Sequence, residues 1–435
     1  MLKQPTPRLE REELEKYVRG FIDRRAAFLQ LVRGHGSPLY ALDKTSLIAR
    51  GREFLGVFRE KFSDCQPYYA VKSNNHPEIA RILVGEGYGL DVSSGEELQT
   101  ALDCGATAII FSGPGKVDSE LELAVKNSGS VTVMLDSLGE LNRLERAAAG
   151  SRQPVRAGVR VTTVESGIWR KFGTPLEKLA EFFQEAEQCR HIQLRGIQFH
   201  ISWNMNPANQ VQFLMRLGEA LKDLDPEHRA RIEFLDIGGG YWPPRGEWLQ
   251  SAATREGMLH TALANAAGSP FDHYKNAAVP LELFAGQIRQ ALKEHLPAEM
   301  QFTLFCEPGR WLCHEAMHII VSVVDRKATD LVITDAGTNA VGWERYESDY
   351  FPVINLTRPS LRENECLIAG SLCTPHDLWG YTYFGDDIQP GDVLLIPHQG
   401  AYTYSLRQHF IKPLPRVVVM NEPGGPAPGP AGETA

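Results

Sequence analysis

The stretch Tyr68-Tyr69-Ala70-Val71-Lys72-Ser73-Asn74-Asn75 places a lysine at the end of an apolar, aromatic run. The run begins near Pro67 and predicts a buried strand, and the polar residues after Lys72 predict a turn. A single lysine in this place is more often a surface residue that happens to close a strand. Its meaning therefore depends on whether the rest of the chain supplies further strands with useful residues at their ends.

Further strand patterns alternate with helical patterns along the chain, and together they predict a barrel. Eight strands alternating with helices over about 250 residues are what a (β/α)8 barrel requires. An open doubly wound sheet would need a glycine-rich turn after the first strand, and none follows Lys72. We therefore predict an α/β fold with a (β/α)8 TIM barrel over residues 45–312. Its candidate strands are 67–72, 87–93, 108–112, 130–135, 155–162, 194–202, 232–238 and 302–307.

The chain outside this barrel divides into further parts. Residues 1–44 predict an N-terminal helical extension and a first strand that packs on the second domain. The stretch 242–278 is long for a connection and predicts extra helices, either as a lid or as an inert surface insertion. Residues 313–420 alternate or run apolar between Gly and Pro, which predicts a C-terminal all-β domain, and 421–435 are rich in Pro and Gly, which predicts a disordered tail.

Composition argues against several classes of function. The 435 residues have a formal net charge of −9 with acidic and basic residues mixed, so we expect no nucleic-acid partner. The seven cysteines contain no CxxC pair, so we expect neither a disulfide framework nor a metal site, and a reducing cytoplasm fits best. The N-terminus has no signal-peptide pattern and no stretch reaches the roughly 18 apolar residues of a membrane span, so we expect no membrane partner.

Chemically useful residues follow the candidate strands, where the functional face of such a barrel lies. A triple glycine after a buried strand lets backbone amides approach an anion such as a phosphate, beside which an arginine supplies fixed charge. Taken singly, each residue has an ordinary explanation as a tight turn, a core histidine or a structural ion pair. The set consists of Lys72, Asp91, Arg160, His200, Gly238, Gly239, Gly240, Glu307 and Arg310.

A lysine, a phosphate cradle and a carboxylate on one face predict pyridoxal 5'-phosphate as the cofactor. The lysine amine forms a Schiff base with the cofactor aldehyde, and an acidic group keeps the pyridine nitrogen protonated so that the ring accepts electrons.

The order of these motifs resembles the fold type III, alanine-racemase-like pyridoxal phosphate decarboxylases, which include diaminopimelate, ornithine and biosynthetic arginine decarboxylases. The resemblance extends over nearly the whole chain, from Ser37 to Tyr402. It implies that Lys72 is the Schiff-base lysine, that His200 stacks on the cofactor ring and that Glu307 pairs with the pyridine nitrogen. It implies cofactor contacts for Asp91, Glu97, Arg160, Ser202, Gly238, Gly239, Gly240, Arg310 and Tyr402 as well.

The chain departs from the family pattern at three places. The family continues from its histidine through a Val-Gly-Ser-Gly type sequence, whereas this chain has His200-Ile201-Ser202-Trp203-Asn204, which shifts the serine by one place. After Cys373, where amine-recognising members commonly have an acid, the chain has Thr374-Pro375-His376-Asp377. The substrate arginine of the diaminopimelate branch does not reappear cleanly in Gly342-Trp343-Glu344-Arg345-Tyr346. The substrate-side candidates are therefore Trp343, Arg345, Thr374 and Asp377.

The resemblance implies a decarboxylase that removes the α-carboxylate of a small-molecule amino-acid substrate by Schiff-base exchange at Lys72 and protonation of the resulting carbanion. Cys373 resembles the cysteine that the second subunit of a homodimer brings into the site, and we predict that it donates the proton. The sequence around Cys373 resembles decarboxylases of conjugated or carrier-bound amino acids in siderophore and other specialised pathways. The run 334–339 is closest to the diaminopimelate branch, so a diaminopimelate decarboxylase proper stays open, as do an amino-acid racemase and a non-catalytic homologue.

Overall fold

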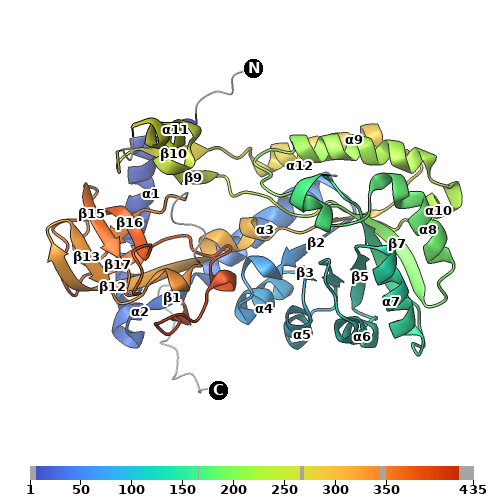
Figure 1. Cartoon of the computed structure of the whole chain (residues 1–435), viewed down its shortest axis with the longest axis horizontal. Helices are drawn as coiled ribbons and strands as arrows, with labels where there is room; N and C mark the ends of the chain where they lie inside the picture. Colours follow the sequence, from blue (N-terminus) through green and yellow to red (C-terminus); the bar gives the residue numbers. More distant parts are fainter. Residues whose placement is uncertain (1–5, 165, 265–268, 343–348, 421–435) are drawn as a thin grey trace. The chain divides into compact units, whose positions relative to one another are not determined.

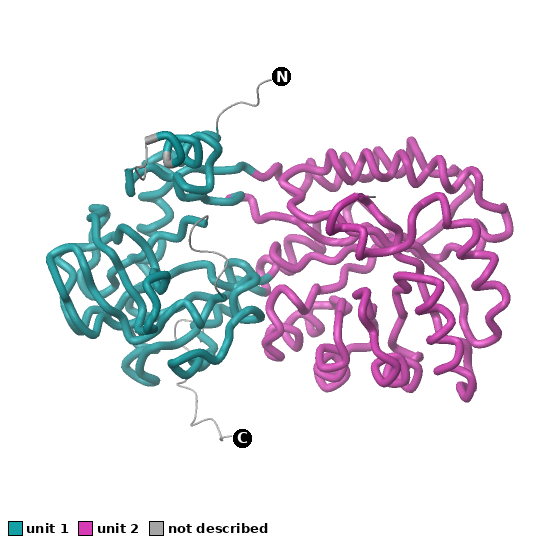
Figure 2. Tube along the Cα trace, in the orientation of Figure 1, with its two compact units in different colours: residues 1–47, 246–277, 313–435 teal, residues 48–245, 278–312 magenta. Residues whose placement is uncertain are grey.

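The computed structural model describes residues 6–164, 166–264, 269–342 and 349–420 (Figure 1). The predicted disordered tail lies outside these residues. The chain forms two compact units: unit 1 comprises 1–47, 246–277 and 313–435, and unit 2 comprises 48–245 and 278–312 (Figure 2). Within the described ranges, no helix is both long and apolar enough to cross a membrane.

Unit 2 contains a closed barrel of eight parallel strands in the order β11-β2-β3-β4-β5-β6-β7-β8, which confirms the predicted (β/α)8 fold. The strands are β2 (Cys65–Ala70), β3 (Gly89–Val92), β4 (Ile109–Phe111), β5 (Val131–Leu135), β6 (Val155–Arg160), β7 (Ile192–Gln198), β8 (Phe234–Asp236) and β11 (Thr303–Cys306). Figure 1 shows helices alternating with them along the chain. These are α3 (Lys44–Lys61), α4 (Pro77–Gly85), α5 (Gly95–Asp103), α6 (Asp118–Lys126), α7 (Leu138–Ala148), α8 (Leu179–Glu187), α9 (Ala208–Asp223), α10 (Pro226–Ala230), α12 (Leu281–His295) and α13 (Arg310–Cys313).

The interior of the barrel is filled by side chains, so the barrel is a packed core. The rings of Phe234 and Phe305 stack with their centroids 4.6 Å apart. Gly196 makes room for them, because a Cβ there would lie 2.3 Å from the Phe234 ring. Van der Waals contact of this kind fixes the strands relative to one another, so residues at the strand ends have defined positions.

Unit 1 is built on an eight-stranded sheet in the order β13-β15-β16-β14-β17-β12-β1-β18, and it is the separate β-rich domain that the sequence predicted. Its strands are β1 (Leu39–Leu42), β12 (Met317–Ala328), β13 (Leu331–Thr334), β14 (Val353–Asn355), β15 (Glu363–Ala369), β16 (Leu378–Phe384), β17 (Val393–Ile396) and β18 (Arg416–Val419). Strand β1 pairs antiparallel with β12 and parallel with β18. Helices α1 (Arg11–Asp23) and α2 (Arg25–His35) bury Val18, Phe21 and Phe28 in the core of this unit.

Residues 246–277 of the long connection that follows β8 also belong to unit 1. It contains β9 (Glu247–Gln250), α11 (Arg255–Ala264) and β10 (His273–Asn276), and β9 pairs antiparallel with β10. The sequence predicted helices here, whereas the structure has a hairpin together with one helix. The difference arises because Trp248 of β9 is buried against Tyr350 of unit 1, a tertiary contact that overrides the weak local pattern.

Candidate active site

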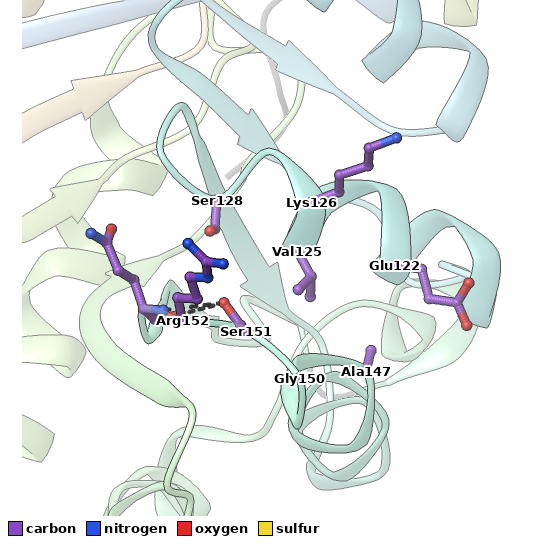
Figure 3. Close-up of a pocket in the computed structure, with 9 residues that line it drawn as sticks. Glu122, Val125, Lys126, Ser128, Ala147, Gly150, Ser151 and Arg152 are labelled. Carbon is purple, nitrogen blue, oxygen red and sulfur yellow. Dashed lines mark hydrogen bonds between the residues drawn. The ribbon is translucent and has the colours of Figure 1, made fainter.

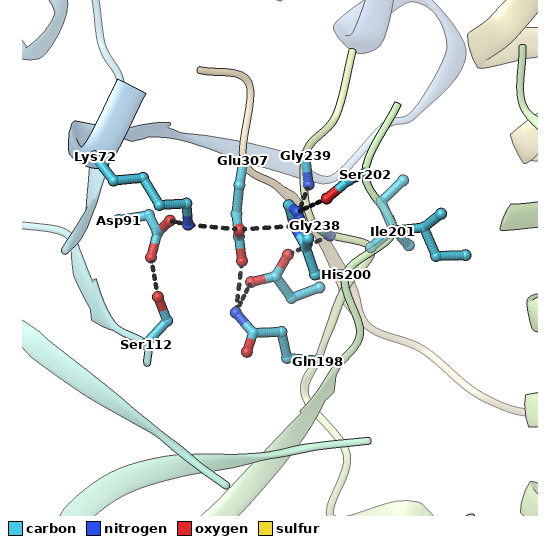
Figure 4. A network of polar contacts seen from close by, with 12 residues as sticks. Lys72, Asp91, Ser112, Gln198, His200, Ile201, Ser202, Gly238, Gly239 and Glu307 are labelled. Atoms are coloured by element: carbon cyan, nitrogen blue, oxygen red, sulfur yellow. Dashed lines mark hydrogen bonds and ion pairs between the residues drawn. The ribbon is translucent and has the colours of Figure 1, made fainter. Parts of the chain in front are cut away.

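The predicted cofactor residues of unit 2 lie at the carboxyl ends of the barrel strands (Figure 4). The strand before the lysine ends at Ala70, and Lys72 lies in the following 3-10 turn η1 (Val71–Ser73) rather than in the strand itself. Asp91 is on β3 and Arg160 ends β6, whereas His200 with Ser202, Gly238 to Gly240, and Glu307 with Arg310 follow β7, β8 and β11 respectively. The closed parallel barrel therefore brings these residues to one face.

Lys72 is held by two buried acids. Its Nζ donates a hydrogen bond to Asp91 Oδ2 at 2.8 Å and lies 3.9 Å from Glu307 Oε2. Ser112 Oγ donates to the other oxygen of Asp91 at 2.5 Å. Burial, followed by the nearby Glu307 charge, raises the pKa of Asp91 to about 7. The lysine amine therefore faces an acid that exchanges a proton close to neutral pH.

Glu307 is the ionised carboxylate of the site. Burial opposes its ionisation, but the side chains of His200, Lys72 and Arg160 outweigh burial and lower its pKa below the ordinary value. Gln198 Nε2 donates to Glu307 Oε1 at 2.5 Å, which supports the negative charge. A buried anion of this kind is what a protonated pyridine nitrogen requires as a partner.

The imidazole of His200 stands between Glu307 and the glycine loop. Its Nδ1 lies 3.5 Å from Glu307 Oε2 and 3.1 Å from the amide nitrogen of Gly239 (Figure 4). Burial lowers the pKa of His200, so the ring is neutral at neutral pH. Ser202 Oγ lies 3.4 Å from His200 Nε2, which places this serine at the edge of the histidine ring.

The conformation of the loop from Gly238 to Gly240 requires glycine at all three positions. Gly238 and Gly240 have φ of +69° and +84°, and a Cβ on Gly239 would lie 2.3 Å from the carbonyl oxygen of Glu307. The amides of Gly238 and Gly239 donate to Asp236 and His200. In the part of the chain that the structure describes, the Gly240 amide donates to no protein acceptor. This amide is therefore available to an anion.

The segments that hold Lys72 and Glu307 are packed directly against each other. A Cβ on Gly309 would lie 2.9 Å from Ser73, so only glycine lets the Glu307 segment pass the lysine turn. Beyond it, the guanidinium carbon of Arg310 lies 4.3 Å from the centroid of the Trp242 ring. A fixed lysine, a buried anion, an available amide and a nearby guanidinium together fit pyridoxal phosphate, which requires an amine, a carboxylate and a phosphate site.

Arg160 and Glu97, two further residues predicted to contact the cofactor, each have a partner within unit 2. The guanidinium carbon of Arg160 lies 4.6 Å from the centroid of the Phe172 ring, and its positive charge contributes to the ionisation of Glu307. Glu97 accepts the amide of Ser93 at 2.7 Å, where α5 begins. Glu97 thus holds the turn after β3.

The predicted residues of unit 1 lie in its own loops. Cys373 is exposed, Thr374 is half-buried, and Tyr402 has a left-handed backbone with φ of +57°. Trp343 and Arg345 lie outside the described residues.

Asp377 has a clear role in the Cys373 loop. Its carboxylate accepts the amides of Thr338 at 2.7 Å and Leu372 at 2.6 Å, and the residue is only 3% exposed. Two glycines make room for it, because a Cβ on Gly337 or Gly370 would lie within 2.5 Å of its oxygens. The carboxylate therefore ties two chain segments together.

Sequence reasoning missed three polar residues of the barrel site, Ser112, Gln198 and Asp236. Asp236 and Gln198 each end a barrel strand, two residues before Gly238 and His200 respectively. A polar residue at the end of a predicted barrel strand is a signal of a site residue, and the sequence contained it. Ser112 gave none, because serine after a strand is common in turns.

Unit 2 contains a pocket of about 500 Å³, and Figure 3 shows residues that line it. Residues of α6 and α7 and the turns that lead into β5 and β6 line it, among them Lys126, Ser128 and Arg152. Connections from helix to strand lie at the amino-terminal face of such a barrel, where residues serve stability rather than catalysis. The pocket is therefore separate from the lysine site.

A parallel barrel with a lysine, an ionised glutamate and a glycine loop at one face defines a class of pyridoxal phosphate enzymes. A family model described as the pyridoxal binding domain of pyridoxal-dependent decarboxylases matches residues 52–314. The chain belongs to this family. It is a pyridoxal phosphate-dependent carboxy-lyase that acts on an amino acid.

Individual relatives match nearly the whole chain. It is 28% identical over 415 residues to a diaminopimelate decarboxylase of Methanothermobacter thermautotrophicus, covering 91% of this chain and 89% of that protein. It is 26% identical over 418 residues to an L-glutamyl-(BtrI acyl-carrier protein) decarboxylase of Niallia circulans, covering 89% of each. The structure of diaminopimelate decarboxylase from M. jannaschii in complex with L-lysine matches with a TM-score of 0.73 at 24% identity, over 90% of this chain and 88% of that chain.

Proposed function

We propose that the protein removes the α-carboxylate of a diamino acid or other amino acid whose distal end is conjugated or carrier-bound. The observation behind this proposal is that the carboxylate of Asp377 already accepts hydrogen bonds from the backbone amides of Thr338 and Leu372. A free distal ammonium would need an acid in this loop, because a charge withdrawn from water without a partner is costly. The residue after Cys373 is Thr374, which offers a hydroxyl instead. The relative that acts on a glutamyl carrier protein supports the same reading.

Bound pyridoxal phosphate supplies an aldehyde that reacts with amines and a ring that accepts the electrons of the broken bond. Lys72 would hold the cofactor until the substrate amine replaces it, and Asp91, 2.8 Å from Nζ, would take and return the proton of that amine. Glu307 would keep its negative charge beside the ring nitrogen. The Gly240 amide and Arg310 would bind the phosphate, and His200 would support the face of the ring.

Cys373 is our candidate for the group that protonates the carbon from which carbon dioxide has left. A thiol donates this proton only within hydrogen-bond reach of that carbon. The family resemblance assigns this cysteine to the second subunit, so we propose a homodimer with shared sites. An exposed thiol in the described part of unit 1 is compatible with that role.

Carbon dioxide release from the purified protein tests the proposal. The panel contains a citrate-conjugated and an acyl-conjugated diamino acid, a glutamyl carrier protein, meso-diaminopimelate, lysine, ornithine and arginine. We expect release from a conjugate and little from the free basic amino acids. Lys72→Ala should abolish release, because it removes the amine that would form the Schiff base with the cofactor. Full activity of that variant, or release from free amino acids alone, would contradict the proposal.

Diaminopimelate decarboxylation is the second candidate. The relative of 28% identity bears that name, and the run 334–339 resembles that branch. Release from meso-diaminopimelate in the same panel, at a rate above that of every conjugate, would favour it.

A further inference from the structure

Asp236 is a buried carboxylate that the chemistry above does not use. It is the last residue of β8 and is fully buried. Its Oδ1 accepts the amide of Gly238 at 2.9 Å, which closes the turn at the start of the glycine loop. Its Oδ2 accepts Gln198 Nε2 at 3.2 Å.

Gln198 extends this contact to the far side of the site. It is the last residue of β7, it is paired with Asp236 in the barrel register, and it is only 1% exposed. The same Nε2 donates to Glu307 Oε1 at 2.5 Å. A continuous chain of hydrogen bonds thus runs from Gly238 through Asp236 and Gln198 to Glu307, across three neighbouring strands of the barrel.

We propose that Asp236 is a positioning residue that couples the two ends of the cofactor site. It holds the glycine loop in the shape that leaves the Gly240 amide available to the phosphate. Through Gln198 it also fixes the carboxylate of Glu307, which faces the ring nitrogen. Asp236 touches neither the cofactor nor the substrate in this scheme and acts only through these neighbours.

The charge state of Asp236 agrees with this role. Burial, followed by the charge of Glu307, raises the pKa of Asp236 well above its ordinary value. A neutral acid holds the glycine loop without placing a second negative charge beside Glu307. The side chain of Asn has the same shape and keeps an oxygen for the Gly238 amide, whereas its amide nitrogen cannot accept from Gln198 Nε2.

Cofactor binding to the apoenzyme provides a test that needs no substrate. The dissociation constants of pyridoxal phosphate and of pyridoxal are measured by the visible absorbance of the bound cofactor, and the ratio of the pyridoxal constant to the pyridoxal phosphate constant reports the phosphate contacts alone. We expect Asp236→Ala to reduce this ratio about tenfold, the value of one charge-assisted hydrogen bond. Asp236→Asn should keep the wild-type ratio. Gln198→Met should also keep it while lowering kcat, because it removes the Gln198 hydrogen bond to Glu307 but leaves the bond between Asp236 and the Gly238 amide.

Asp136→Ala is the matched control. Asp136 is a buried acid after β5 that accepts the amide of a different glycine, Gly173, at 2.5 Å. Its removal should leave the ratio unchanged, and thermal unfolding of each apoenzyme reports whether the variant is folded. An unchanged ratio in folded Asp236→Ala would overturn the proposal, as would an equal fall in Asp136→Ala.

Should Asp236→Ala not fold, the scheme can still be refuted, because a reduced ratio in Asp236→Asn or Gln198→Met contradicts it. The role of Asp236 rests on cofactor binding and not on the proposed substrate. A wild-type protein that binds pyridoxal phosphate but releases no carbon dioxide from the panel would refute the proposed function and leave this test intact.

Discussion

At the scale of single residues, the pair Lys72 and Asp91 predicts a pH dependence of stability. The pKa of Asp91 in the folded apoenzyme is about 7, above the ordinary pKa of an aspartate. At any pH between these two pKa values, the folded state therefore binds more protons than the unfolded state. The resulting stabilisation is complete at low pH and is lost as the pH rises through about 7. Asp91→Asn removes this titration. We expect the free energy of unfolding of wild type minus that of Asp91→Asn, measured by urea denaturation, to fall between about pH 4 and pH 7 and to be constant above that range. A flat or rising difference would show that Asp91 is ionised throughout.

Cys373 gives the second prediction at this scale. Replacing it by alanine removes the proposed proton donor but none of the contacts at Lys72. We expect slower decarboxylation or a side product, with unchanged affinity for pyridoxal phosphate. Product analysis and cofactor titration measure the two effects separately, and Cys189→Ala, in unit 2 and distant from the Cys373 loop in sequence, is the control. Unchanged kinetics in Cys373→Ala would remove this thiol from the mechanism.

The candidate site could be predicted where function depends on residue type at a strand end, as for Lys72, His200 and Glu307. The site could not be predicted where the role of a side chain depends on its hydrogen-bond partners. The sequence predicts Asp377 as an acid that binds the substrate, but its carboxylate accepts hydrogen bonds from the amides of Thr338 and Leu372. Such partners are set by the fold. The sequence alone does not distinguish a carboxylate that binds a ligand from one that binds backbone amides.

At the scale of elements, the glycine loop predicts a sharp contrast between two substitutions. Gly239→Ala would place a methyl group 2.3 Å from the backbone oxygen of Glu307, so the loop or the Glu307 segment must move. We expect lost cofactor affinity and a loss of stability of about 1–3 kcal/mol. Gly286→Ala, inside α12 with no atom beyond the adjoining backbone within 4 Å of the new methyl group, should instead stabilise the protein by about 0.5–1 kcal/mol. Thermal unfolding and cofactor titration distinguish them, and normal cofactor binding by Gly239→Ala would mean that the loop is adaptable.

The elements themselves were predictable to different degrees. Each barrel strand is a short apolar run, because both faces of a parallel barrel strand are buried, and this signal is strong. The hairpin of β9 and β10 was not predicted, because its strands are four residues each and depend on burial of Trp248. The sequence predicts strand as far as Lys72, beyond the observed end of β2 at Ala70, for a related reason, since Val71 of the lysine turn η1 is as apolar as the strand before it.

At the scale of the whole molecule, unit 1 is assembled from segments far apart in the chain. Leu39 of β1 pairs with Ile320 of β12 and with Arg416 of β18, so this end of the sheet joins strands from both ends of the chain. Neither pairing has a local sequence signal, because β1 is four residues long and fully buried. Non-local pairing of this kind needs the remainder of the sheet before it is stable.

The proposed homodimer gives the last prediction, which concerns shared sites. If Lys72 of one subunit works with Cys373 of the other, Lys72→Ala and Cys373→Ala subunits can complement each other. Random exchange of equal amounts yields about half heterodimers, each with one intact site, and so about a quarter of wild-type activity. Size-exclusion chromatography reports the dimer, and carbon dioxide release reports the activity. A mixture of Lys72→Ala with the Lys72→Ala, Cys373→Ala double variant is the control and should stay inactive. If subunits exchange but the mixture only averages its two parents, each site lies within one chain, and Cys373 would then have to act on the lysine of its own subunit or not at all.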